Sequence, residues 1–201
     1  MITIVNYGMG NLGSIQNMLK KIGQKSSITS DIEEIKEAEK IILPGVGSFD
    51  PAIKRIHELK FFDILNQKAL VDCVPILGIC LGMQLLTTSS EEGELNGFNW
   101  IPAQTIKFDV PKNLKVPHMG WNFVKEESDS PILDNLYKKS KFYFVHSFHV
   151  RLDDQKDCIL STDYGIEFVS AVQRKNIYGV QFHPEKSHKY GMKILENFSS
   201  I

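Results

Sequence analysis

Residues 76–85 read Ile-Leu-Gly-Ile-Cys-Leu-Gly-Met-Gln-Leu, and this stretch decides the fold. Its first half predicts a buried strand, and Leu81 to Thr87 predict a helix. The junction, Gly78-x-Cys80-x-Gly82, has the layout of a nucleophile elbow with cysteine in place of serine. Because such a sharp turn raises its central side chain clear of the sheet edge, the pattern predicts a reactive sulfur at a strand end.

The predicted surroundings of Cys80 favour the thiolate, which is the nucleophilic form of cysteine. A sulfur above a helix N-terminus is stabilised by the helix dipole and by free backbone N–H groups. The N–H of Leu81 would point to where an oxyanion forms during acyl transfer. The alternative is a structural cysteine between two packing glycines, which so short a motif leaves open.

A cysteine nucleophile needs a partner base, because an ordinary thiol has a pKa near about 8.5. The best candidate is His183 in His183-Pro184-Glu185, which directly follows an apolar strand. A carboxylate at Glu185 can fix the imidazole tautomer and stabilise the imidazolium. A surface His-Pro-Glu turn would explain this segment alone. Together with Cys80, it predicts a Cys–His–Glu catalytic triad.

The segments before the elbow predict parallel strands joined by helices. Ile2–Val5 and Ile41–Leu43 read as buried strands. A helix follows the first strand and ends at Gly23, and Asp50-Pro51 suggests the cap and first turn of the helix after the second. Strands separated by helices pair in parallel with right-handed crossovers.

The second half has strand-like runs with short connections, at 100–108, 142–145, 168–172 and 177–182, and a final helix near 194–198. Residues 173–176 suggest a hairpin between the last two strands. We therefore expect one α/β domain over 1–201, with a central, mostly parallel sheet flanked by helices and extended by antiparallel strands.

Composition excludes several classes of partner. The formal net charge of −1 argues against a broad electrostatic surface for nucleic acid or anionic lipid. No apolar run approaches the roughly 18 residues that span a bilayer, and the N-terminus lacks the features of a signal peptide. Three cysteines suit a reducing compartment, with Cys73 and Cys158 expected to be packed thiols. A cytoplasmic protein without nucleic acid or membrane partners is expected.

Several segments resemble the class I (triad) glutamine amidotransferases, and within them the glutaminase subunits of imidazole glycerol phosphate synthase. Besides 78–84 and 183–187, the matching segments are Asn-Tyr-Gly-Met-Gly-Asn (6–11), Leu-Pro-Gly-Val-Gly-Ser-Phe (43–49), Ser-Glu-Glu-Gly (90–93), Val-Pro-His-Met-Gly-Trp-Asn (116–122) and Phe-Val-His-Ser-Phe (144–148). Two positions depart from the family pattern: Gly-Phe-Asn-Trp (97–100) stands for a common Gly-Leu-Gly, and Phe148 replaces a frequent tyrosine.

The resemblance implies a flavodoxin-like fold and hydrolysis of glutamine to glutamate and ammonia. Cys80 would be the nucleophile, His183 the general base and acid, and Glu185 the orienting carboxylate. It further implies an oxyanion hole from the backbone of Gly47 and Leu81. The implied glutamine contacts are Gly47, Gln84, His146, Ser147 and Phe148.

The resemblance also implies a partner and no cofactor or metal. Ammonia would pass to a synthase (cyclase) subunit, a HisF-like β/α barrel, in a heterodimer that makes imidazole glycerol phosphate and AICAR in histidine biosynthesis. Asn11 and Lys186 would face this partner. The family also has paralogues whose ammonia serves another acceptor such as a surface sugar, and this alternative stays open.

Other functions compete with this interpretation. Residues 8–13 fit G-x-G-x-x-G after a strand, and Asp31 lies near the distance expected of a ribose-binding acid in a dinucleotide-binding module. A cysteine peptidase shares the Cys–His pair, and a non-catalytic partner subunit could share the fold. His146 and His149 suggest a metal pair, but no clustered ligands complete it, which favours structural histidines.

Overall fold

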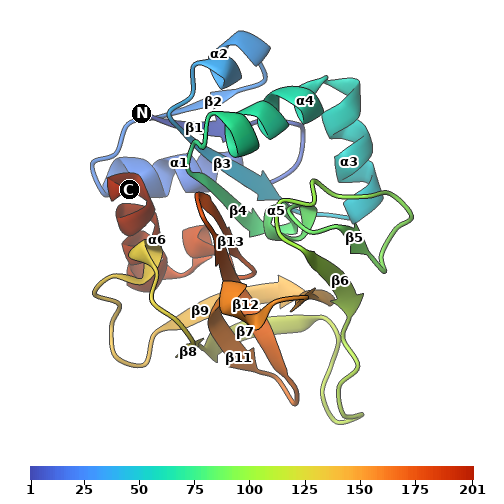
Figure 1. Cartoon of the computed structure of the whole chain (residues 1–201). Helices are drawn as coiled ribbons and strands as arrows, with labels where there is room; N and C mark the ends of the chain where they lie inside the picture. The colour runs from blue at the N-terminus through green and yellow to red at the C-terminus, as the bar shows by residue number, and fades with distance from the viewer.

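The computed structural model describes residues 1–201, and a parallel sheet forms its centre (Figure 1). The central strands are β1 (Ile2–Val5), β2 (Ser26–Thr29), β3 (Lys40–Gly45), β4 (Ile76–Cys80) and β13 (Ile177–Val180). They are parallel in the order β2-β1-β3-β4-β13, which begins with the flavodoxin-like order 2-1-3-4. The predicted parallel strands are confirmed. The sequence did not indicate β2, because its residues Ser-Ser-Ile-Thr include one large apolar side chain.

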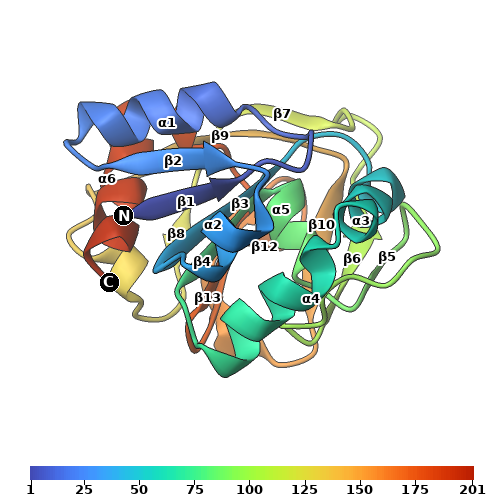
Figure 2. The same ribbon diagram turned by 90° about the horizontal axis from the view of Figure 1, so that it is seen from above.

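Helices cover both faces of this sheet (Figures 1 and 2). On one face lie α1 (Leu12–Lys21) and α6 (His188–Ser200), whose apolar side chains pack on Ile42 and Leu77. On the other lie α2 (Ile32–Lys36), α3 (Phe49–Glu58) and α4 (Phe61–Asn66), which continues into a π-helical turn η1 (Gln67–Val71). Because alternate strand residues point to opposite faces, neighbours such as Ile41 and Ile42 belong to different cores.

The second half extends the sheet mostly with antiparallel pairs, as predicted, and its first two strands pair in parallel. Its strands are β5 (Ser89–Ser90), β6 (Ala103–Lys107), β8 (Lys125–Glu126), β10 (Phe148–Leu152), β11 (Cys158–Asp163) and β12 (Glu167–Arg174). A separate two-stranded sheet joins β7 (His118–Phe123) to β9 (Lys141–His146). The expected hairpin links β12 to β13 through Lys175, whose φ is 54°. Short 3-10 turns are η2 (Pro131–Leu133), η3 (Gln155–Asp157) and η4 (Pro184–Lys186).

Two local predictions were wrong. The helix expected to be capped by Asp50 begins at Phe49, with Ser48 at the N-cap. Asp50 instead accepts hydrogen bonds from the backbone N–H groups of Glu94 and Leu95, at 3.0 and 3.1 Å. Cys73, expected to be packed, is exposed two residues after η1, whereas Cys158 is buried as predicted. None of the helices is both long enough and apolar enough to cross a membrane.

Candidate active site

Cys80 occupies a strained turn between β4 and α5 (Leu81–Leu85). Its φ of 56° and ψ of −111° are unusual for a residue with a side chain, and such strain is concentrated at functional sites. The flanking glycines permit the turn by close packing. A Cβ at Gly82 would lie 1.9 Å from the carbonyl oxygen of Leu43, and one at Gly78 would lie 2.6 Å from the carbonyl oxygen of Gly82. The elbow predicted from the sequence is therefore present.

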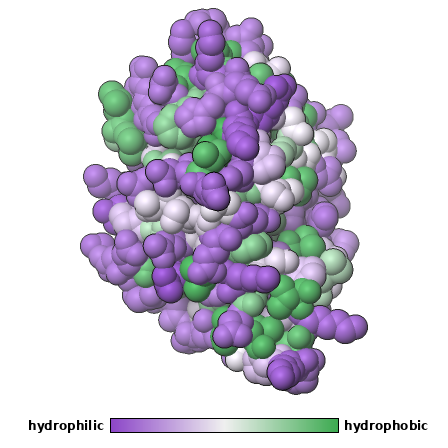
Figure 3. Space-filling model, turned by 90° about the vertical axis from the view of Figure 1, so that its right-hand side faces the viewer, coloured by the Kyte–Doolittle hydropathy of each residue, from purple (hydrophilic) through white to green (hydrophobic).

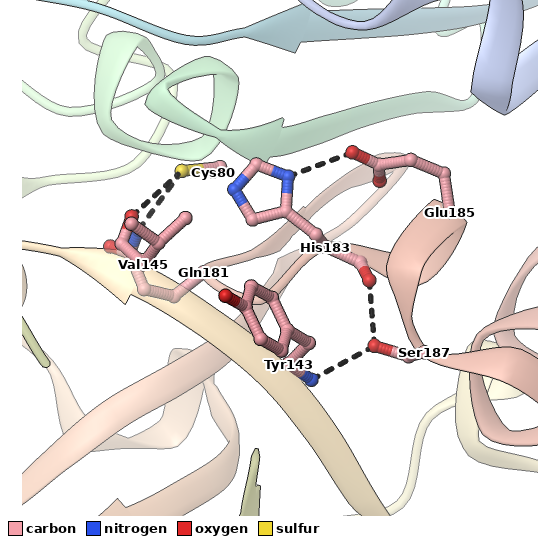
Figure 4. Close-up of polar contacts among 7 residues, drawn as sticks. All are labelled: Cys80, Tyr143, Val145, Gln181, His183, Glu185 and Ser187. Atoms are coloured by element: carbon pink, nitrogen blue, oxygen red, sulfur yellow. Dashed lines mark hydrogen bonds and ion pairs between the residues drawn. The ribbon is translucent and has the colours of Figure 1, made fainter. Parts of the chain in front are cut away.

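His183 and Glu185 lie on the neighbouring strand end, where β13 passes into η4 (Figure 4). His183 Nδ1 and Glu185 Oε1 are 2.8 Å apart, and both side chains are at most 2% exposed. Ser187 fixes this turn, because its hydroxyl donates to the His183 carbonyl at 2.6 Å and accepts from the Tyr143 N–H at 3.0 Å. His183 is thus held both by its backbone carbonyl and by its imidazole ring.

The second ring nitrogen of His183 faces Cys80 (Figure 4). This Nε2 atom is buried and makes no hydrogen bond to any nitrogen or oxygen of the chain. Burial lowers the pKa of His183, but interactions with the Cys80 sulfur and the Glu185 carboxylate outweigh it and raise the pKa to about 9. A protonated imidazole facing the Cys80 sulfur is therefore the state of His183 that this geometry favours.

A cavity of about 280 Å³ opens above the sulfur. Twelve residues line it: Val46, Gly47, Cys80, Leu81, Gln84, Glu92, Pro117, Val145, His146, Ser147, Phe148 and His183. The structure thus brings the predicted nucleophile, its base and every predicted oxyanion and glutamine residue to one cavity. The other four residues were not predicted individually, although each lies within a segment that carried the family resemblance: Val46, Glu92, Pro117 and Val145.

Both N–H groups of the Gln84 side-chain amide donate hydrogen bonds within the protein. Its Nε2 donates to the Phe148 carbonyl at 3.2 Å and to Gln181 Oε1 at 3.1 Å. The amide oxygen is therefore the part of Gln84 that remains for a bound molecule. Gln181 was missed from the sequence, because a glutamine near the end of an apolar strand carries no motif of its own.

The two predicted partner-facing residues lie on one side of the molecule. Asn11 precedes α1 and Lys186 ends η4, both are exposed, and α1 contacts η4. Lys186 Nζ lies 5.7 Å from the centre of the Tyr143 ring. Tyr143 belongs to β9, whose last residues Val145 and His146 line the cavity. These positions are compatible with a partner that docks beside the cavity.

Comparison with known proteins agrees with this geometry. The family profile Glutamine amidotransferase class-I matches residues 3–200. The chain belongs to this family. Within it, the chain is 56% identical to imidazole glycerol phosphate synthase subunit HisH 2 of Methanococcus maripaludis, with 98% of each covered. It is 48% identical to subunit HisH of Archaeoglobus fulgidus, covering 100% of this chain and 98% of that protein. This class I amidotransferase is thus a member of the HisH family.

Solved structures support the amidotransferase fold. The chain superposes on PurLQS from Thermotoga maritima with a TM-score of 0.75 at 18% identity, covering 99% of this chain and 97% of that one. It matches a glutamine amidotransferase from Thermotoga maritima with a TM-score of 0.65 at 17% identity, covering 99% of this chain and 82% of that one. At these identities the likeness concerns the fold alone.

The amidotransferase geometry also accounts for the features behind the rival interpretations. Asp31 caps α2, because its carboxylate accepts from the Glu33 N–H at 2.7 Å, so it is not a free ribose-binding acid. His146 donates from Nδ1 to the Phe148 carbonyl at 2.7 Å and contacts His118 through Nε2 at 3.0 Å. No three His, Cys, Asp or Glu side chains are grouped to hold a metal ion.

Proposed function

We propose that the chain is the glutaminase subunit of an imidazole glycerol phosphate synthase in histidine biosynthesis. It hydrolyses glutamine through Cys80, His183 and Glu185 and delivers the ammonia to a synthase subunit. One observation carries the proposal: a cysteine on a nucleophile elbow and the imidazole that it faces line one cavity, and the other nitrogen of that imidazole lies 2.8 Å from a buried carboxylate.

The proposed reaction proceeds in two halves. The Cys80 thiolate attacks the carboxamide carbon of glutamine, and the carbonyl oxygen becomes an oxyanion. Protonated His183 gives its proton to the departing nitrogen, so the C–N bond breaks, ammonia leaves and a glutamyl thioester remains. His183 then removes a proton from water, which attacks the thioester, releases glutamate and restores the thiolate beside a protonated His183. Glu185 holds the imidazole in the required tautomer throughout.

The oxyanion would be bound by the backbone N–H groups of Leu81 and Gly47. Removing one such donor costs about 3–4 kcal/mol of transition-state stabilisation, so their orientation controls the rate. Gly47 has a φ of +106° and has free space around its Cα, which permits its peptide to rotate. We propose that partner binding turns the 44–48 loop so that an N–H faces the oxyanion. High glutaminase turnover by the isolated chain, unchanged by the synthase subunit, would contradict this control.

The surface beside the cavity supports a protein partner. Pro117 lines the cavity, and β7 then exposes Met119 at 61%, Trp121 at 41% and Phe123 at 57%. Three large apolar side chains on one exposed strand face are typical of a docking surface. Figure 3 shows hydrophobic patches among hydrophilic ones on the side of the molecule that is turned toward the viewer.

We propose that the partner is a HisF-like β/α barrel that forms a heterodimer with this chain. Lys186 and Asn11 lie at the same side as Tyr143, whose ring is 6.2 Å from that of Trp121. A sealed interface here would keep ammonia from protonation in bulk water. Residues 1–201 would act as one amidotransferase domain in the cytoplasm, which suits three free cysteines.

The test is reconstitution of this chain with a HisF-like synthase subunit. With glutamine, the pair should form imidazole glycerol phosphate and AICAR. Cys80→Ala should abolish the glutamine-dependent reaction but retain the reaction driven by ammonium salt. The matched control is Cys73→Ala, which removes an exposed thiol and should leave both reactions within about twofold. Glutamine hydrolysis without imidazole glycerol phosphate formation would assign the ammonia to another acceptor, such as a sugar.

A further inference from the structure

A chain of hydrogen bonds runs along the wall of the cavity from β7 to the nucleophile. In order, its members are Asn122, His118, His146, the Phe148 carbonyl, Gln84, Gln181 and Cys80. Gln181 and His118 are at most 2% exposed, and Gln84 and His146 are 5% and 6% exposed. These four side chains therefore have little contact with solvent, and each amide or imidazole depends on its neighbour for its orientation.

The backbone carbonyl of Phe148 sets the direction of the whole chain, because a carbonyl can only accept. His146 Nδ1 must therefore carry the proton it shares with this oxygen, at 2.7 Å. Burial lowers the pKa of His146 to about 3, so the ring is neutral and its Nε2 is an acceptor. It follows that His118 donates from Nδ1 to His146, at 3.0 Å.

The same carbonyl fixes the two glutamines. Gln84 must present Nε2 to Phe148, and the second N–H of that amide then points to Gln181 Oε1 at 3.1 Å. Gln181 is left with its Nε2 toward the sulfur of Cys80, at 3.8 Å (Figure 4). Gln181 can only donate to the sulfur in this arrangement, and it cannot turn its oxygen there without breaking the bond to Gln84.

The Gln181 N–H offsets the repulsion between the Cys80 thiolate and the nearby carbonyl oxygen of Val145. The Cys80 thiol lies 3.9 Å from the carbonyl oxygen of Val145, to which it can donate while protonated. Once the thiol ionises, that carbonyl oxygen faces a negative sulfur. An N–H from the Gln181 amide compensates for this repulsion, since hydrogen bonds to ionised groups are the stronger kind.

We propose that Gln181 is a positioning residue that donates a hydrogen bond to the Cys80 sulfur, stabilises the thiolate and holds it in line with His183. Gln84 orients Gln181, and the Phe148 carbonyl orients Gln84. The inference rests on the proposed function, because it assumes that Cys80 is the nucleophile.

The test measures alkylation of Cys80 by iodoacetamide against pH in Gln181→Met and Gln181→Glu. Methionine keeps nearly the same length without a donor, and glutamate turns the donor into a negative acceptor. The matched control is Gln67→Met, on an exposed glutamine of η1. Peptide mass spectrometry separates the product at Cys80 from those at Cys73 and Cys158.

Other ionisable groups near the sulfur are the same in all variants. They are His183 with Glu185 from η4, Tyr7 after β1, His146 from β9 and Glu92 from the loop beyond β5. A difference between variants therefore reports the side chain at 181. We expect the alkylation midpoint to move to higher pH by about one unit in Gln181→Met, a tenfold change in thiolate fraction, and further in Gln181→Glu. We expect kcat for glutamine to fall by about tenfold or more while KM stays within about threefold.

Three outcomes are decisive. An unchanged midpoint in folded Gln181→Met overturns the proposal. A shift in Gln181→Glu alone also overturns it, because added charge would then account for the effect and a lost donor would not. Should Gln181→Glu fail to fold, Gln181→Met carries the test by itself. If the unaltered protein shows no faster alkylation at Cys80 than at Cys73, the proposed nucleophile is wrong, which is a different failure.

Discussion

Glu185 Oε1 lies 2.8 Å from His183 Nδ1, and the contact is almost completely excluded from solvent. Glu185→Gln should lower the pKa of His183 from about 9 toward the ordinary value, because the carboxylate is one of the groups that raise it. The neutral amide would also fail to fix the tautomer, so kcat should fall by about 10²–10⁴-fold. Glutamate release over pH 6–9 measures both effects. An unaltered pH profile in the Glu185→Gln protein would contradict the assigned pair.

The same pair makes stability depend on pH. His183 has a pKa of about 9 in the folded chain and about 6.5 when unfolded, so the folded state holds this proton more tightly. Its contribution to stability is complete below about pH 6.5 and is lost as pH rises to about 9. Urea unfolding across this range should show the decline, and Glu185→Gln should flatten it. Equal slopes in the two proteins would count against a charged His183 in the fold.

The buried His118 should make the free energy of unfolding depend on pH in the opposite direction, with stability lost in acid. Burial lowers the pKa of His118 to about 4, below its unfolded value of about 6.5, so the unfolded chain binds the extra proton. This contribution is complete above about pH 6.5 and is lost as pH falls toward 4. His118→Gln, which keeps a donor for His146, should reduce the slope of unfolding free energy by up to about 1.4 kcal/mol per pH unit. Exposed His57→Gln is the control and should leave the slope unchanged.

The glycines at the elbow should tolerate no side chain. Gly82→Ala would place a Cβ 1.9 Å from the Leu43 carbonyl oxygen, which is backbone and cannot move aside. We expect a loss of about 3 kcal/mol or more in unfolding free energy. Gly13→Ala is the matched control, because its Cβ meets nothing within 4 Å in helix α1. It should stabilise the chain by up to about 1 kcal/mol. Chemical unfolding distinguishes the two, and a mild Gly82→Ala phenotype would refute the packing argument.

Asp50 should control glutamine binding through the acidic loop. Its carboxylate holds the N–H groups of Glu94 and Leu95, while Glu92 accepts from the Phe49 N–H at 2.9 Å and lines the cavity. Asp50→Ala should release this loop and raise KM for glutamine by about 3–10-fold, with a smaller change in kcat. Asp50→Asn, which keeps one acceptor oxygen, should lie between. Asp63→Ala, on an exposed position of α4, should change neither constant. An equal rise in KM for glutamine in Asp63→Ala would contradict a specific role of Asp50 in holding the acidic loop.

The features that could be predicted from the sequence are those encoded by neighbouring residues. The elbow at Cys80 follows from glycines two positions away, and the contact between His183 and Glu185 spans two residues across a proline. The buried strands β1, β3, β4 and β13 follow from short apolar runs, and those runs settle the α/β class.

Only the tertiary structure decided which distant groups meet. Asp50 does not cap the helix as expected, because its carboxylate accepts hydrogen bonds from backbone N–H groups more than forty residues away. Gln181 reaches Cys80 because β13 lies beside β4, and Gln84 can orient it only because β10 brings the Phe148 carbonyl to the same place. Periodicity and turn chemistry act over a few residues, whereas the neighbours of a buried polar group are set by strand order and by the requirement that each buried donor finds an acceptor.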